Sequence, residues 1–74
     1  MNKNNQEPSS NQIGILIGLF EDNNLVHLLK KISVLLKKFP QSYSLHNIAG
    51  ITNQNLGHFD QSLTLLQKAI NISP

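Results

Sequence analysis

The chain has 74 residues, no cysteine, six lysines without any arginine, and a formal net charge of +2. A chain of this length forms one small domain with a thin core, and without cysteine it has neither disulfides nor thiolate metal sites to support that core. The absence of arginine argues against a dedicated nucleic-acid reader, because bidentate contacts to phosphates and guanine edges depend on the guanidinium group.

Residues 1–9, MNKNNQEPS, are polar and contain one proline. Such a composition buries too little apolar surface to offset the entropy lost on ordering, which predicts a flexible polar tail. The tail lacks the order of a secretion signal, in which a positive cluster leads into an apolar run and a cleavage site. No later stretch reaches the roughly 18 consecutive apolar residues of a membrane helix. We therefore expect a cytoplasmic chain with no membrane contact.

Apolar residues then recur at spacings of three and four in successive blocks, which predicts helices over residues 10–21, 25–38, 43–55 and 60–71. The connections contain Asn23 and Gly57, and both residue types tolerate the left-handed conformation that closes a helix. Pro40 cannot continue the second helix and ends it. Asp60 is expected to cap the fourth helix with its carboxylate.

The two halves of the chain are related by a constant shift in sequence, the one that carries Pro40 to Pro74, which we call the repeat offset. The same shift places Asn23 on Gly57. It also places apolar residues on apolar residues: Leu25 on Phe59, Leu29 on Leu63, Ile32 on Leu66 and Leu36 on Ile70. We therefore expect Asn23 to adopt the same left-handed conformation as Gly57.

The segment SLHNIAGITNQNLGHFDQSLTLLQKAINISP resembles a tetratricopeptide repeat (TPR) over nearly its whole length. The repeat offset matches the period of that family, which is about 34 residues. Ala49 and Gly50 stand where the family has its Leu-Gly pair, and Ala69 and Pro74 stand at its closing Ala and Pro. The segment departs from the family pattern at its Trp, Tyr and small Ala positions, which are occupied by His46, Asn53 and Ser62. Residues 10–40 resemble a degenerate repeat, with Gln12, Leu16 and Leu28 at the Trp, Gly and Ala positions.

This resemblance implies an all-α fold: a right-handed α-α superhelix, or solenoid, of two TPR-like hairpins with four antiparallel helices. The expected organisation is a flexible tail at 1–9, a degenerate N-terminal repeat at 10–40 and a second repeat at 41–74. The chain is similar to the N-terminal two repeats of a bacterial TPR-containing protein. In the second repeat, Gly50 is expected to allow a close approach to Ser62.

The sequence offers no constellation typical of catalysis, a metal or a cofactor. His27, His46 and His58 lack the spacing of a helical metal motif. His46 is interpreted as a half-buried packing residue, since it stands at the Trp position of the family, and the other two as exposed. Four lysines repeat every seven residues, Lys30, Lys31, Lys37 and Lys38. They are interpreted as one solvated helix face, with nucleic-acid binding as the alternative.

In the TPR family the first helix of each repeat lines a concave groove, which implies a partner-binding surface here. The matching positions are Ile13, Ile17, Phe20, Asn47, Ile51 and Gln54. The alternative is that Ile13, Ile17 and Phe20 only pack inside the array. We expect a protein-interaction or substrate-presenting scaffold without catalysis of its own, which binds a protein or peptide in the groove. Further repeats or a catalytic domain are expected beyond Pro74. The alternative function is the N-terminal targeting region of a longer TPR-linked glycosyltransferase or sulfotransferase.

Overall fold

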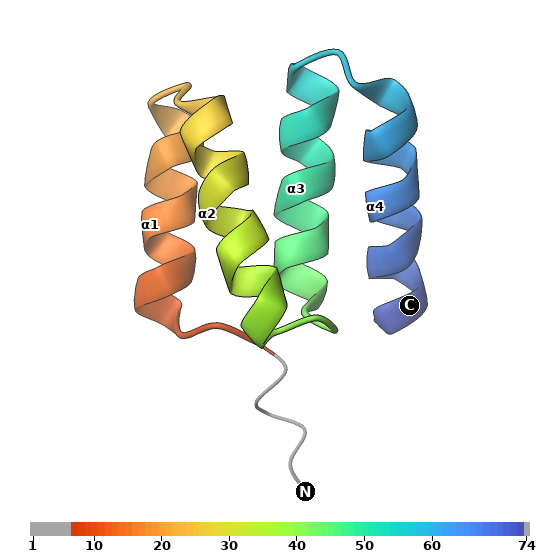
Figure 1. Cartoon of the computed structure of the whole chain (residues 1–74), viewed down its shortest axis with the longest axis horizontal. Coiled ribbons are helices and arrows are strands. Elements are labelled where there is room, and N and C mark those ends of the chain that lie inside the picture. The colour runs from red at the N-terminus through yellow and green to blue at the C-terminus, as the bar shows by residue number, and fades with distance from the viewer. Residues whose placement is uncertain (1–6, 74) are drawn as a thin grey trace, which may run out of the picture.

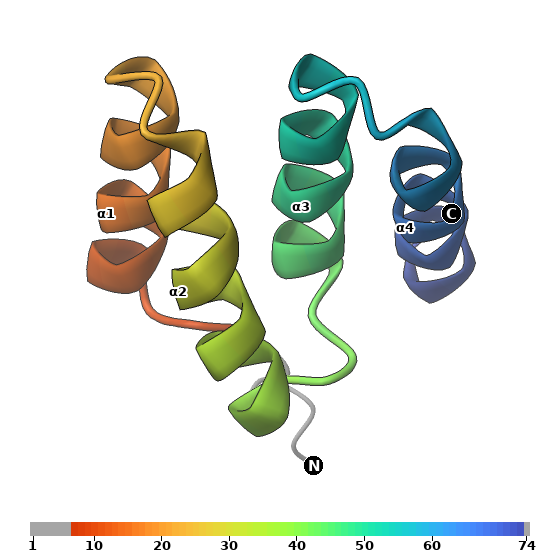
Figure 2. The same ribbon diagram turned by 45° about the horizontal axis from the view of Figure 1, so that its top comes forward.

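The computed structural model describes residues 7–73, which form four α-helices and no strand. The helices are α1 (Ser10–Glu21), α2 (Leu25–Lys38), α3 (Tyr43–Asn55) and α4 (Phe59–Ile72). They lie side by side in chain order, consecutive helices run in opposite directions, and α1 and α4 stand at the two ends of the row (Figure 1). A view turned by 45° shows the same order (Figure 2). The prediction of an all-helical chain with four helices is confirmed.

The predicted boundaries agree with the structure for the first three helices, and α4 is one residue longer at each end than predicted. The expected cap of α4 was wrong. His58 occupies the N-cap position and makes no capping side-chain hydrogen bond, while Asp60 lies inside the first turn. A carboxylate there still interacts favourably with the positive end of the helix dipole. Pro40 does follow the end of α2, whose last residue is Lys38.

A serine caps the first helix of each hairpin. The Ser9 side chain accepts a hydrogen bond from the backbone N–H of Gln12 at 3.2 Å, and the Gln12 side chain accepts one from the Ser9 N–H at 3.0 Å. This reciprocal pair is a capping box. In α3 the Ser42 hydroxyl accepts from the N–H of Leu45 at 3.0 Å. Both helix starts therefore have a side-chain partner for an otherwise unpaired amide.

Glu7 adds a second cap to α3 from a distant part of the chain. Its carboxylate accepts a hydrogen bond from the Ser42 hydroxyl at 2.6 Å and another from the backbone N–H of Tyr43 at 2.7 Å. The next residue, Pro8, is buried. The last three residues of the expected tail thus make defined contacts, while the expectation of a flexible tail at 1–6 lies outside the described residues.

The two hairpins have the same turn geometry. Asn23 has a φ of 59° and Gly57 has a φ of 84°, so the left-handed conformation predicted for both is confirmed. The N–H of Asn24 donates to the carbonyl of Leu19 at 2.9 Å, and one repeat offset later the N–H of His58 donates to the carbonyl of Asn53 at 2.8 Å. This long backbone bond is the one that closes a Schellman motif. The bounds of α2 and α4 are related by the same offset.

The buried core lies where α2 packs between α1 and α3. Its members are Leu16, Leu25, Leu28, Ile32, Leu45 and Ala49. A second, closer contact joins α3 to α4 at Gly50. A Cβ atom placed on Gly50 would lie 2.6 Å from the Leu66 Cδ2 atom, so only glycine leaves room for that side chain. The expectation for this contact is corrected: Leu66, not Ser62, supplies the atoms nearest to Gly50, although Ser62 is also buried.

Candidate partner-binding surface

Helices α1 and α3 together form a shallow apolar hollow. Ile17 and Phe20 of α1 and Ile48 and Ile51 of α3 line about 100 Å³ of open space, which we call the α1/α3 hollow. Ile17 is 45% exposed and Ile51 is 38% exposed. Ligand pockets for small molecules usually measure about 300–1,000 Å³, so this hollow has room for one side chain rather than for a cofactor.

The structure brings together three of the six residues predicted for the groove: Ile17, Phe20 and Ile51. Ile13 is half-buried, packs against the core and does not line the hollow. The alternative that these α1 residues pack inside the array therefore describes Ile13, and in part the half-buried Phe20, but not the exposed Ile17.

The two predicted polar residues flank the hollow along α3. Asn47 is half-buried and Gln54 is exposed, four residues before and three residues after Ile51. These spacings place the three side chains on one face of the helix. Ile48 also lines the hollow, although it was not among the residues predicted for the groove. Its position three residues before Ile51 was the signal that it could reach the same face.

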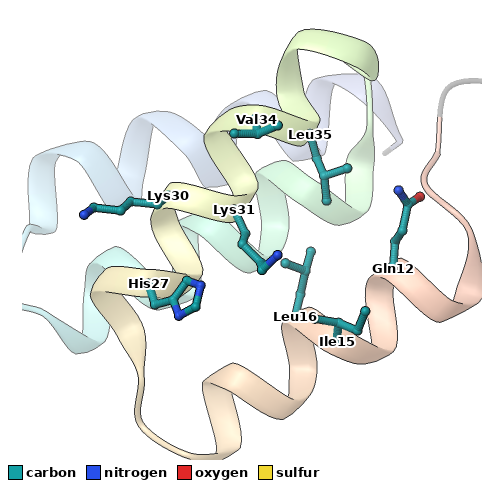
Figure 3. A pocket seen from close by; sticks show the side chains of 8 residues that line it. All are labelled: Gln12, Ile15, Leu16, His27, Lys30, Lys31, Val34 and Leu35. Carbon is teal, nitrogen blue, oxygen red and sulfur yellow. The ribbon is translucent and has the colours of Figure 1, made fainter.

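A larger hollow lies between α1 and α2, with a volume of about 460 Å³, and we call it the α1/α2 hollow. Its lining is Gln12, Ile15 and Leu16 from α1 with His27, Lys30, Lys31, Val34 and Leu35 from α2. Figure 3 shows the Lys31 side chain extending toward Leu16 across the hollow, whereas Lys30 points away from α1. Ile15 is 56% exposed and Val34 is 63% exposed.

The sequence did not predict the α1/α2 hollow. The four clustered lysines are all exposed, as the solvated-face interpretation expected. The missed signal is the pair Ile15 and Val34, two apolar side chains that are exposed on neighbouring helices. The hollow thus combines apolar side chains with a lysine that reaches over them, and none of the described residues that line it carries a carboxylate.

His46 is the histidine most closely integrated into the fold. It is 7% exposed, so the expectation of a half-buried side chain is corrected to a buried one. Its Nε2 lies 3.0 Å from the carbonyl oxygen of Pro40, which can only accept, so Nε2 carries the hydrogen. The other ring nitrogen, Nδ1, is buried and has no hydrogen-bond partner among residues 7–73. His46 therefore ties the α2–α3 connection to α3.

The other two histidines are exposed, as predicted. The Nδ1 atom of His58 is 3.1 Å from the side-chain oxygen of Asn53, a contact that joins the start of α4 to the end of α3. Across residues 7–73, no three His, Cys, Asp or Glu side chains gather as a metal site would require. Within the same range, no helix has both the length and the apolar character needed to cross a membrane.

Comparisons of this chain with protein-family models, with curated proteins and with solved structures find no match.

Proposed function

We propose that this chain is a TPR-like interaction module that binds a segment of a partner protein across α1 and α3. The observation that carries the proposal is the α1/α3 hollow. Two of its side chains, Ile17 and Ile51, remain well exposed although they belong to helices that pack in the same fold. An apolar side chain of a partner would cover both and remove their surface from water, which is favourable by about 25 cal/mol per Å².

The polar residues beside the hollow supply the second part of the recognition. Asn47 and Gln54 carry side-chain amides, each of which both donates and accepts hydrogen bonds. An extended peptide presents backbone N–H and C=O groups that match such amides. The proposed ligand is therefore a short peptide segment that places one apolar side chain in the α1/α3 hollow and pairs its backbone with α3.

The repetition of the two hairpins supports a TPR-like solenoid as the framework. The bounds of α2 and α4, the left-handed residues Asn23 and Gly57, and the matching turn hydrogen bonds are all related by the repeat offset. A regular offset of this kind superposes the first helix of one hairpin on that of the next. Such first helices form one continuous surface in repeat proteins. The hypothesis that a catalytic domain follows this module stays a prediction.

The proposal is tested by selecting binders from a library of displayed random peptides on the full chain. Selected peptides should share an apolar residue, and they should lose binding when Ile51 is changed to Asp. The matched control is Val26→Asp, because Val26 is also an exposed apolar side chain, at 63%, but lies on α2 outside the hollow.

The Ile51→Asp and Val26→Asp variants should both retain the helix content of the parent chain. Peptides that bind the parent and Val26→Asp but not Ile51→Asp support the proposal. Peptides that bind all three chains equally, or that are lost only with Val26→Asp, place recognition on another face and contradict it.

A further inference from the structure

One face of α4 carries a row of large apolar side chains, three of which are exposed in the described chain. Phe59 is 67% exposed, Leu63 is 58% exposed and Ile70 is 60% exposed. Together with the half-buried Leu66 they follow one another at spacings of four, three and four residues, so they lie along a single stripe of the helix. We call these four residues the α4 stripe.

Helix α2 carries an equivalent apolar stripe, and there the stripe is covered by a neighbouring helix. One repeat offset earlier, the residues that correspond to the α4 stripe are Leu25, Leu29, Ile32 and Leu36 of α2. Leu25 is 8% exposed and Ile32 is 1% exposed, and Leu29 and Leu36 are half-buried. Since the two helices have equal lengths and equal turns, the difference in burial arises from their neighbours: α3 packs on α2, and α4 stands at the end of the row (Figure 1).

The α2–α3 interface therefore shows what kind of helix face packs against a stripe like that of α4. On α3, Leu45, Ala49 and Thr52 share one face and are 0%, 3% and 0% exposed. Leu45 and Ala49 belong to the same buried cluster as Leu25 and Ile32. The fitting surface is thus a helix face built of small and medium-sized side chains.

The same chain has an open copy of that surface at its other end. One repeat offset earlier, on α1, the counterparts of Leu45, Ala49 and Thr52 are Asn11, Ile15 and Gly18. Asn11 and Ile15 are exposed, and the open Gly14 stands beside them. A Cβ atom placed on Gly14 or Gly18 would meet nothing within 4 Å, so the rest of the described chain does not pack on these two positions of the face.

We propose that copies of this chain associate head to tail, with the α4 stripe of one copy seated on the open face of α1 in the next. The contact continues the α2–α3 interface from one chain to another, and Ile15 extends it into the α1/α2 hollow, where Val34 is also exposed. Because the two faces differ, the interface is heterologous, and each added copy again presents a free stripe and a free α1 face.

This association is separate from the proposed peptide-binding function. The α1/α3 hollow uses Ile17 and Ile51, whereas association uses Ile15 and the α4 stripe. A failure of one proposal therefore leaves the other intact, and variants of Leu63 and Ile15 distinguish them.

The test is sedimentation of the full chain over a wide range of concentrations, together with Leu63→Glu and Ile15→Glu. The parent should grow from one chain to two and more as concentration rises. Each variant alone should remain monomeric, because a carboxylate introduced at an exposed position does not disturb the core but must be desolvated in the interface. Circular dichroism should show unchanged helix content for both.

Mixing the two variants gives the decisive result. Leu63→Glu keeps an intact α1 face and Ile15→Glu keeps an intact α4 stripe, so an equimolar mixture should form a two-chain species and nothing larger. Gln61→Glu is the control, since it adds the same charge to α4 at an exposed position nearly opposite Leu63. It should associate like the parent.

Three outcomes overturn the proposal. A parent chain that stays monomeric at every concentration shows that a second copy does not cover the stripe. Dimers of Ile15→Glu that are lost only in Leu63→Glu indicate pairing of two α4 stripes instead. Association that is unchanged in both variants places the contact elsewhere.

Discussion

Leu66 of α4 lies directly against Gly50 of α3, with its Cγ atom 2.7 Å and its Cδ2 atom 2.6 Å from where a Gly50 Cβ would stand. The backbone nitrogen of Leu66 would be 3.4 Å from the same point, so the two helices themselves are close. A side chain at Gly50 therefore requires the Leu66 side chain to move, and a large one also presses on the nearby α4 backbone. The absence of a Cβ atom at Gly50 therefore leaves the space that the Leu66 side chain occupies between α3 and α4.

Gly50→Leu should destabilise the chain by about 1–3 kcal/mol, the usual cost of overpacking a close contact. The measurement is urea unfolding followed by circular dichroism. Gly14→Ala is the matched control, because Gly14 lies inside α1 with open space around it, and it should gain up to about 1 kcal/mol from helix propensity. Equal effects of the two substitutions would show that the Gly50 contact is unimportant.

Asn23 and Gly57 should respond differently to substitution although they have the same backbone conformation. Asn23→Gly should change the free energy of unfolding by only a few tenths of a kcal/mol, since both residue types tolerate a positive φ. Gly57→Val should cost about 1–2 kcal/mol, because a β-branched residue is strained there. The same unfolding measurement applies, and a tolerated valine would contradict the left-handed assignment.

The features of the fold that depend on neighbouring residues could be predicted from the sequence. Apolar spacing placed the helices, Pro40 ended α2, and the repeat offset identified the shared turn conformation of Asn23 and Gly57. Each of these features depends on a few neighbouring residues or on the comparison of one half with the other, so one sequence was sufficient.

Contacts between distant segments could not be predicted in this way. Which residue lies nearest to Gly50 depends on the rotation of α4 about its axis, which placed Leu66 there instead of Ser62. The residues predicted for the groove were separated for the same reason. The rotation of α1 about its axis places Ile17 at the hollow and Ile13 against the core. The polar composition of residues 1–9 gave no sign that Glu7 would reach α3.

The Glu7 contact leads to a third prediction. Glu7→Ala removes a carboxylate that accepts from the Ser42 hydroxyl and the Tyr43 amide at the positive end of α3. Loss of a helix cap typically costs about 1 kcal/mol. Glu21→Ala is the control, because Glu21 is an exposed carboxylate at the opposite, negative end of a helix, where its removal should not destabilise. A melting temperature that falls equally in both variants would show that Glu7 does not stabilise the start of α3.

The last prediction compares two apolar residues that the repeat makes equivalent, Leu25 at the start of α2 and Phe59 at the start of α4. Leu25 is 8% exposed and belongs to the core cluster, so Leu25→Ala should cost about 2–5 kcal/mol through lost burial and the cavity left behind. Phe59 is 67% exposed, and in the monomer the free energy of unfolding of Phe59→Ala should stay within about 0.5 kcal/mol of the parent, as it does for most surface substitutions.

Unfolding should be measured at low protein concentration, where association does not contribute. Raising the concentration should then stabilise the parent more than Phe59→Ala, because binding to the folded state adds to its stability and the variant has lost part of the α4 stripe. A large cost of Phe59→Ala in the monomer would mean that α4 is turned further toward α3 than the structure shows.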